Sequence, residues 1–308
     1  MSTKIRDSVR QIDDNSWLIG NKLLLRRTSV ADNWLWHTNG LYYTLSDDSP
    51  LFPAPETLPT DSYVRPLYSS ANVTAVWRFG DAFLKIKLFQ GRRDATTENV
   101  TLDWLAKENL SFATPRTFYY TKGDDRSYLF SSRVPGETLA EAWQGMNEDD
   151  KTNYACRIAE ICEELSIRTS EAITGVDGRQ LPDNWLHSSP TPYDFRPETL
   201  RENCTQLGMR TSTSSTFVFC HNDLGPGNIV INSGQVVGII DWEIAGYVPC
   251  EWIRTKFSVG WGMDFNWDND PSEWRLRVEY QLRRKGFPEV TEAWKKWREE
   301  RFQCDPKI

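Results

Sequence analysis

The sequence predicts an α+β fold in two parts, a β-rich first part and a mostly helical second part. Residues 73–79 and 82–89 are expected to be strands joined at Gly80 and Asp81, a two-residue connection typical of a hairpin. Beyond Pro135 and Gly136, apolar side chains recur at helical spacing behind Asn147, a favourable N-cap residue. The change from strands to helices is therefore expected near this Pro-Gly turn.

The remaining elements follow in chain order. Residues 17–25 are a possible strand, and residues 46–66, with five prolines, are expected to be a loop or linker. A helix over 94–108 and further strands within 118–134 complete the first part. In the second part, the predicted helix stripe consists of Tyr154, Ile158, Ile161, Cys162 and Leu165. A compact β segment over 216–242 and a helical tail follow it. We divide the chain into an unassigned extension (1–65), a β-rich part (66–134) and a helical part (135–308).

Charge and composition exclude several classes of protein. The chain has 308 residues and a net charge of −7, without a block of Lys and Arg. A nucleic-acid or anionic-membrane partner is therefore not expected, and a cationic small substrate is favoured. The apolar runs are too short to cross a bilayer, and residues 1–10 lack the apolar core of a signal peptide, which favours the cytoplasm. No oligomeric state is predicted.

One stretch, residues 217–243, carries most of the chemical information. An apolar strand leads to His221 and Asp223, a Gly-Pro-Gly loop follows, and a hairpin is expected to run from Asn228 back to Asp241. If Ser233-Gly234 is the turn, Asn228 lies opposite residue 239, which shares a strand face with Asp241. The two side chains could then hold Mg²⁺ through oxygen atoms.

The position of Asp223 fits phosphoryl transfer. Such a reaction needs a metal ion to neutralise the phosphates and a carboxylate to orient the attacking hydroxyl and accept its proton. Each polar residue alone is more simply explained as a turn former. Their common order and spacing favour a catalytic site.

The motif resembles a known superfamily. His-x-Asp-Leu-x-x-x-Asn followed by apolar-apolar-Asp is similar to the catalytic loop and metal segment of protein-kinase-like enzymes. Asp-Trp-Glu resembles the aminoglycoside phosphotransferase and choline kinase branch, and residues 239–252 are similar to fungal phosphotransferase-family proteins. The resemblance implies a two-lobed kinase-like fold with ATP and Mg²⁺. It makes Asp223 the base, Asn228 and Asp241 metal ligands, and His221 and Glu243 supporting residues. Asn222 stands where many relatives have glycine.

The first part offers a matching nucleotide site. Lys85 lies in an otherwise apolar strand, and in this superfamily such a lysine holds the α- and β-phosphates beside a helix glutamate. Glu98 fits that partner because it shares a helix face with apolar residues. Lys87 is the alternative lysine, and two solvated edge lysines are the simpler explanation.

The phosphate loop and the acceptor site have weaker signals. Without a Gly-x-Gly-x-x-Gly motif, the phosphate contacts are assigned to Ser69, Ser70 and Asn72, which precede the first hairpin strand. Aromatic and acidic residues after the metal segment suit an ammonium group on the acceptor, although a solvated loop would have the same composition. These candidate acceptor residues are Trp261, Asp264, Trp267 and Asp268.

The sequence therefore predicts a small-molecule kinase that phosphorylates a hydroxyl group. A protein kinase is disfavoured by the Trp-Glu after Asp241 and by the lack of an Ala-Pro-Glu segment. A pseudokinase is disfavoured by the intact base and metal residues, although the missing glycine loop leaves it open.

Overall fold

The protein is described by a computed structural model that covers residues 4–47, 56–57, 64–70, 73–90, 92, 94–123, 125–187, 194–212, 214–266 and 270–302. It consists of two compact units. The first contains Met1–Gln90 and Pro115–Arg133, and the second contains Gly91–Thr114 and Val134–Ile308. The helix after residue 97 lies in the second unit, whereas the sequence pattern assigns it to the β-rich part.

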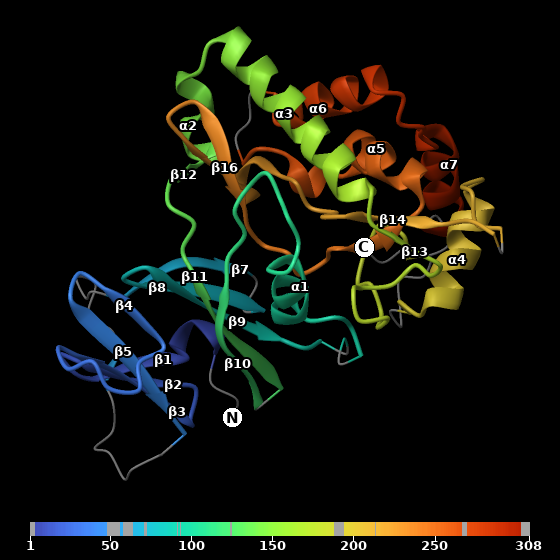
Figure 1. The fold of residues 1–308 in the computed structure, drawn as a ribbon. Helices are drawn as coiled ribbons and strands as arrows, with labels where there is room; N and C mark the ends of the chain where they lie inside the picture. The colour runs from blue at the N-terminus through green and yellow to red at the C-terminus, as the bar shows by residue number, and fades with distance from the viewer. Residues whose placement is uncertain are drawn as a thin grey trace. The chain divides into compact units, whose positions relative to one another are not determined.

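The first unit is built from two antiparallel sheets (Figure 1). The six-stranded sheet has the order β4-β5-β3-β2-β1-β6 and the five-stranded sheet the order β10-β11-β9-β8-β7. The first comprises β1 (Val9–Asp13), β2 (Ser16–Ile19), β3 (Leu23–Thr28), β4 (Trp36–Thr38), β5 (Leu41–Ser46) and β6 (Glu56–Thr57), after a 3₁₀ turn η1 (Ile5–Asp7). The second comprises β7 (Arg65–Ser70), β8 (Thr74–Phe79), β9 (Ala82–Leu88), β10 (Thr117–Gly123) and β11 (Arg126–Ser132).

The strand predictions hold for the five-stranded sheet. Strands β8 and β9 form the predicted hairpin, with Phe79 opposite Ala82, and β10 and β11 occupy the predicted region. The single strand suggested over 17–25 is wrong, because β2 and β3 are two strands separated at Gly20, which has a φ of 62°. Much of the expected loop over 46–66 lies outside the described residues.

The two sheets of the first unit share one core. Trp36 of β4 stacks on Phe118, with ring centroids 5.7 Å apart, and its indole N–H donates to the Phe79 carbonyl at 3.3 Å. Trp17 of β2 meets the edge of Phe79 at 5.6 Å. Since each of these residues joins one sheet to the other, the described residues of β1 to β5 are a structural part of this unit.

The second unit combines helices with two small sheets. The helices are α1 (Glu98–Leu105), α2 (Leu139–Ala142), α3 (Glu148–Ser166), α4 (Pro197–Gln206), α5 (Cys250–Val259), α6 (Glu273–Arg284) and α7 (Thr291–Phe302), with 3₁₀ turns η2 (Trp143–Gly145), η3 (Pro226–Asn228) and η4 (Trp261–Met263). One sheet contains β12 (Glu137–Thr138), β15 (Ile229–Asn232) and β16 (Gln235–Ile239), and the other contains β13 (Thr169–Ser170), β14 (Phe217–Cys220) and β17 (Gly246–Val248). The α+β fold expected from the sequence is confirmed.

Helix α3 matches its prediction closely. Asn147 is the N-cap, and its side-chain oxygen accepts a hydrogen bond of 2.8 Å from the backbone N–H of Asp150. The five residues of the predicted apolar stripe are all buried. The helix predicted over 94–108 is shorter than expected, because α1 begins after Thr97 and ends at Leu105.

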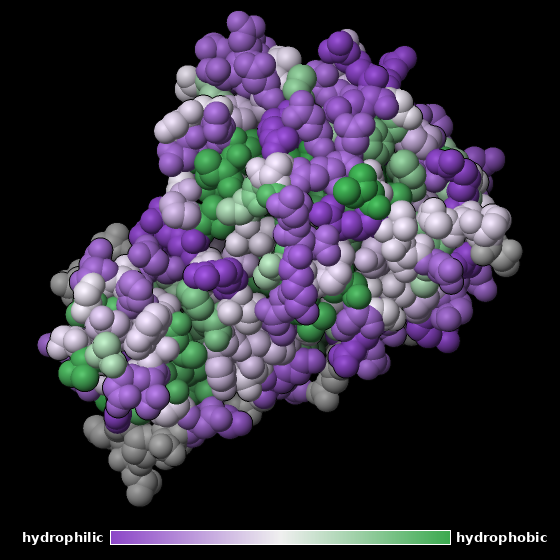
Figure 2. All heavy atoms as spheres, viewed as in Figure 1, coloured by the Kyte–Doolittle hydropathy of each residue, from purple (hydrophilic) through white to green (hydrophobic). Residues whose placement is uncertain are grey.

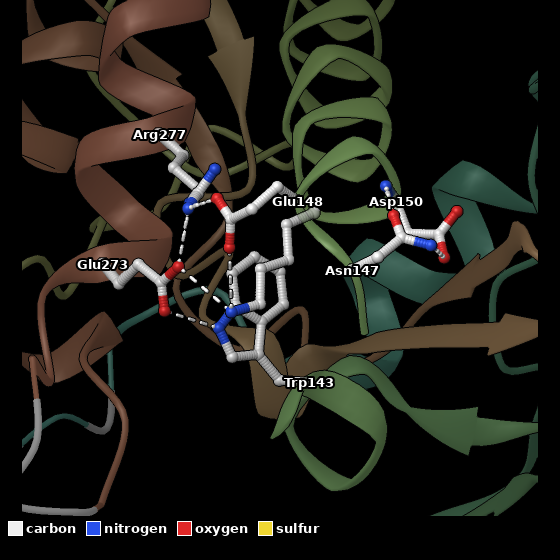
Figure 3. Close-up of polar contacts among 7 residues, drawn as sticks. Trp143, Asn147, Glu148, Asp150, Glu273 and Arg277 are labelled. Carbon is white, nitrogen blue, oxygen red and sulfur yellow. Dashed lines mark hydrogen bonds and ion pairs between the residues drawn. The ribbon is translucent and has the colours of Figure 1, made fainter. Parts of the chain in front are cut away.

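A polar cluster joins the start of α3 to α6 (Figure 3). The Glu273 carboxylate accepts from the Trp143 indole N–H at 2.9 Å and from Arg277 at 2.7 Å. Arg277 also donates to Glu148 at 2.6 Å, and Lys151 lies 3.3 Å from Glu273. Because Glu273 is partly buried, these donors offset the cost of removing its charge from water.

Among the described residues, no helix has the length and apolar character needed to cross a bilayer. On the face drawn in Figure 2, hydrophilic side chains predominate, with apolar ones between them.

Candidate active site

His221 fixes the start of the catalytic loop. It follows β14, is fully buried, and places Nε2 3.0 Å from the carbonyl of Ile240. Its Nδ1 accepts a hydrogen bond of 3.1 Å from the backbone N–H of Asp223. Since Nδ1 accepts, Nε2 carries the proton and donates to Ile240. One neutral imidazole thus ties the backbone of Asp223 to the backbone of Ile240, the residue before Asp241.

Two non-glycine residues of the site have left-handed backbone conformations. Asn222 has a φ of 66° and Asp241 a φ of 64°. Glycine, asparagine and aspartate adopt this region more readily than other residues. The conformation explains why asparagine can replace the glycine of many relatives at position 222, where its amide also donates to the Ile244 carbonyl at 3.1 Å.

Asp223 and Asn228 are bound to each other. The Asn228 Nδ2 group lies 2.8 Å from the Asp223 carbonyl and 3.2 Å from its carboxylate oxygen Oδ2. Because both contacts use the amide nitrogen, the amide oxygen of Asn228 is directed elsewhere and can act as a metal ligand.

The predicted hairpin register is wrong by one residue. Asn232 pairs with Gln235 as expected, but Ile229, and not Asn228, lies opposite Ile239. A bulge between Val230 and Ile231 accommodates the extra residue. Asn228 belongs to the 3₁₀ turn η3, and it stays near the returning strand because its carbonyl accepts from the Ile240 N–H at 2.9 Å.

The carboxyl of Asp223 titrates near neutrality. Burial is the largest cause and raises its pKa, the Asp241 carboxylate raises it further, and the Lys256 ammonium lowers it, so that the pKa moves from 3.8 to about 7. One edge of the side chain still lines a pocket. A carboxyl of this kind can accept a proton at physiological pH.

Three carboxylates gather beside the end of β16. Oxygen atoms of Glu98, Asp241 and Glu243 lie within 4.8 Å of one another. The backbone N–H of Trp242 donates to Glu98 at 3.2 Å, which attaches the start of α1 to this segment. The Trp242 ring is fully buried and stacks beside Phe112. The ring therefore anchors the segment between Asp241 and Glu243.

The predicted nucleotide residues other than Glu98 belong to the first unit. Lys85 lies in β9, where it pairs with Val76 of β8 and Leu129 of β11. Ser69 and Ser70 end β7, and Asn72 lies outside the described residues. Lys85 thus occupies a central strand, not the sheet edge that the alternative explanation required.

The predicted acceptor residues have a different arrangement from the expected one. Asp264 is bound by the Arg275 guanidinium, which neutralises its charge. Trp261 is 66% exposed and meets the edge of Trp185 at 5.1 Å. Trp267 and Asp268 lie outside the described residues.

A pocket of about 230 Å³ lies beside Asp223 within the second unit. Its lining includes Glu243 and Lys256, together with Arg92 and residues 182–185. We call residues 182–185 and Arg92 the Asp183 wall. Sequence reasoning identified Asp223 and Glu243 in this lining and missed the Asp183 wall and Lys256.

A buried ion pair holds the Asp183 wall in place. Lys256 Nζ lies 2.7 Å from Asp183 Oδ1, and both side chains are almost fully buried. Asp183 also accepts from the Trp252 indole at 2.9 Å and from the Trp185 backbone N–H at 2.9 Å. The sequence held one signal for this pair, because Lys256 lies four residues after Trp252 and next to Phe257 on an apolar helix face. Nothing similar marked Asp183.

The model of the phosphotransferase enzyme family matches residues 68–250, more than half of the chain. The chain belongs to this family. As a member it is a small-molecule phosphotransferase, which confirms the enzyme class expected from the motif. The catalytic loop, Asp241 and Glu243 all lie inside the matched residues, whereas β1 to β6 precede them. A search of curated proteins gives no match.

Solved structures similar to this family member include aminoglycoside phosphotransferases. APH(3'')-Id from Streptomyces rimosus has 18% sequence identity and a TM-score of 0.49, covering 77% of this chain and 92% of that one. The streptomycin-ATP ternary complex of APH(2'')-IIa has 16% identity and a TM-score of 0.47, covering 76% of this chain and 82% of that one.

Proposed function

We propose that this phosphotransferase moves the γ-phosphate of ATP to a hydroxyl group of a small molecule in the presence of Mg²⁺. The observation that carries the proposal is the position of Asp223, which lines a pocket and contacts Asn228 while Asp241 acts on its charge. The acceptor oxygen forms a bond to the γ-phosphorus, the bond from that phosphorus to the β,γ-bridging oxygen breaks, and ADP leaves.

Asp223 is the base in this proposal. Its backbone N–H is held by His221 and its carboxylate by Asn228, so the side chain is oriented before the acceptor binds. The acceptor hydroxyl would donate its proton to Asp223 as its oxygen attacks the phosphate. A pKa of about 7 suits this transfer. Near neutral pH much of the carboxyl is deprotonated, and it still has enough proton affinity to accept the proton of the hydroxyl.

The donor set fits a hard cation. Carboxylate oxygens of Asp241, Glu243 and Glu98 lie within 4.8 Å of one another, and the Asn228 amide oxygen is left over by its contacts to Asp223. Oxygen donors of this kind are those that Mg²⁺ prefers. Asn228 and Asp241 would hold the ion and Glu243 would support it; when bound, it neutralises phosphate charge.

The nucleotide contacts extend the proposal to the first unit. Lys85 would bind the phosphates and Glu98 would orient it, while Ser69, Ser70 and Asn72 would supply hydrogen bonds to the phosphate oxygens. An amine on the acceptor stays a prediction, and it loses one support because Asp264 is already bound by Arg275.

The proposal is tested by replacing Asp241 in the full chain. Asp241→Ala should abolish Mg²⁺-dependent transfer from [γ-³²P]ATP to a pool of polar metabolites, while the circular dichroism spectrum stays that of the wild type. Asp149→Ala, at an exposed position in the first turn of α3, is the matched control and should retain transfer. Full activity in Asp241→Ala would contradict the metal assignment.

The same assay separates the rival functions. Nucleotide-dependent thermal stabilisation without transfer to any acceptor would indicate a pseudokinase. Label that enters generic protein substrates, and not metabolites, would indicate a protein kinase.

A further inference from the structure

The chemistry of the pocket lining restricts the acceptor. Three carboxylates line the pocket: Asp183, Asp223 and Glu243. An ammonium group on an acceptor would need one of them as its partner. Each, however, has another role within the described residues.

Asp183 is saturated by internal donors. Its two oxygens accept from the Lys256 ammonium, the Trp252 indole and the Trp185 backbone N–H, and the side chain has no exposed surface. Glu243 belongs to the carboxylate group around Asp241, and Asp223 is the proposed base. No carboxylate of the described lining is therefore left for an acceptor cation.

The Asp183 wall carries hydrogen-bond donors at the pocket. The Arg92 guanidinium lines the pocket and lies over the Phe195 ring, 5.4 Å from its centroid. Arg92 also donates to the Asn184 side-chain oxygen at 2.9 Å. Asn184 is exposed and lines the pocket, and its amide has two N–H donors besides the oxygen that accepts from Arg92.

Lys256 balances the charge of Asp183 on this side of the pocket. Its ammonium has three donors, and Asp183 accepts one of them at 2.7 Å. The Trp185 and Trp252 rings lie 5.8 and 5.5 Å from the ammonium, so the cation is held by faces of aromatic rings as well as by one carboxylate. The pocket lining thus combines the Asp223 carboxylate with the hydrogen-bond donors of Arg92 and Asn184.

We propose that the acceptor is a hydroxyl compound that also carries an oxyanion, with the hydroxyl at Asp223 and the anionic oxygens at Arg92 and Asn184. Guanidinium and amide donors match the planar oxygens of a carboxylate or the oxygens of a phosphate. The proposal rests on the phosphotransferase function described above and names the acceptor class of the same pocket. It is an alternative to the amine-bearing acceptor favoured by net charge.

The first experiment asks which charge class of metabolite accepts phosphate. A deproteinised, charcoal-treated extract of polar metabolites is separated by ion exchange into anionic, neutral and cationic fractions. Each is incubated with the full-length enzyme, Mg²⁺ and [γ-³²P]ATP, with Asp223→Asn as the blank. We expect label in products of the anionic fraction.

The outcomes distinguish this proposal from the proposed function. Label only in neutral or cationic products would overturn the oxyanion and leave the phosphotransferase standing. No label in any fraction would overturn both. Treatment of the anionic fraction with phosphatase before the assay separates the two oxyanions, because a carboxylate acceptor survives it and a phosphate-bearing acceptor does not.

The second experiment tests the residues. With the labelled acceptor, Arg92→Gln should raise the acceptor KM roughly 10- to 150-fold, the usual effect of losing a charge-assisted hydrogen bond. The KM for ATP should stay unchanged, and Arg92→Lys should recover part of the loss. Arg157→Gln, at a half-buried position of α3 outside the pocket lining, is the matched control. An acceptor KM unaffected by Arg92→Gln would refute the assignment of this wall.

Discussion

The catalytic loop and the Asp183 wall face the same pocket, but they are held by different kinds of contact. His221, Asp223, Asn228 and Ile240 are joined by short hydrogen bonds that involve the backbone at every step. The wall depends on an ion pair between side chains 73 residues apart, Lys256 and Asp183. Local backbone geometry thus fixes the base, whereas long-range packing fixes the opposite wall.

The largest expected effect is on turnover, and it concerns Asp223 in the catalytic loop. Asp223→Asn should lower turnover by on the order of 10²–10⁴, since it removes the proton acceptor and keeps the side-chain shape. ATP affinity, measured by isothermal titration calorimetry, should remain. A collapse of ATP affinity with persisting turnover would make Asp223 a structural residue and remove the contrast between the two sides.

Replacing a residue that holds the Asp183 wall should have its main effect on the free energy of unfolding. Lys256→Met strands the buried Asp183 carboxylate and should lower the free energy of unfolding by about 3–5 kcal/mol, as measured by denaturant titration. Lys295→Met is the control, because its partner Glu292 is exposed and such pairs contribute about 0–1 kcal/mol. Equal losses in the two variants would show that the ion pair does not hold the wall.

The pH dependence separates the two sides further. The pKa of Asp223 is raised in the folded protein, from 3.8 to about 7, so the folded state binds a proton that the unfolded state has released. Stability from this group is present at acid pH and is lost as pH rises from about 4 through about 7. Without metal or nucleotide, the free energy of unfolding of Asp223→Asn should therefore rise by up to about 4 kcal/mol, relative to that of the wild type, as the pH increases from 4 to 8. Parallel stability curves would contradict this.

The smallest effect is expected at the pocket surface. Asn184→Ala should change the free energy of unfolding by less than about 0.5 kcal/mol, because the side chain is exposed and Asp183 keeps its own donors. Thermal unfolding by calorimetry would measure this. A loss as large as that of Lys256→Met would mean that Asn184 supports the wall and does not merely line it.

Sequence patterns predicted the parts of the molecule that depend on neighbouring residues. The β8–β9 hairpin, the Asn147 cap and the order of Asp223, Asn228 and Asp241 all follow from short-range rules. The bulge after Val230 could not be predicted, since both registers keep a plausible alternation of apolar residues.

The contacts of the Asp183 wall were beyond such rules for a different reason. Residues 92, 183 and 256 meet only because three segments pack together, and a lone aspartate after a proline gives no sign of a buried partner. For the acceptor residues, composition could not reveal the ion pair: Asp264 follows an aromatic cluster, and its charge is paired with Arg275.

The shared core of the first unit has a consequence for producing this enzyme in pieces. A fragment trimmed to the family-matched residues would lack β1 to β6 and uncover Trp77 and Phe79, which are buried in the intact chain. It would also lack Ser8, whose buried hydroxyl accepts from the Arg126 guanidinium at 2.7 Å. Such an exposed apolar sheet promotes aggregation. Expression of the shortened enzyme should yield inclusion bodies. During synthesis of the full chain, the apolar face of the first sheet stays uncovered until β7 to β11 have been made.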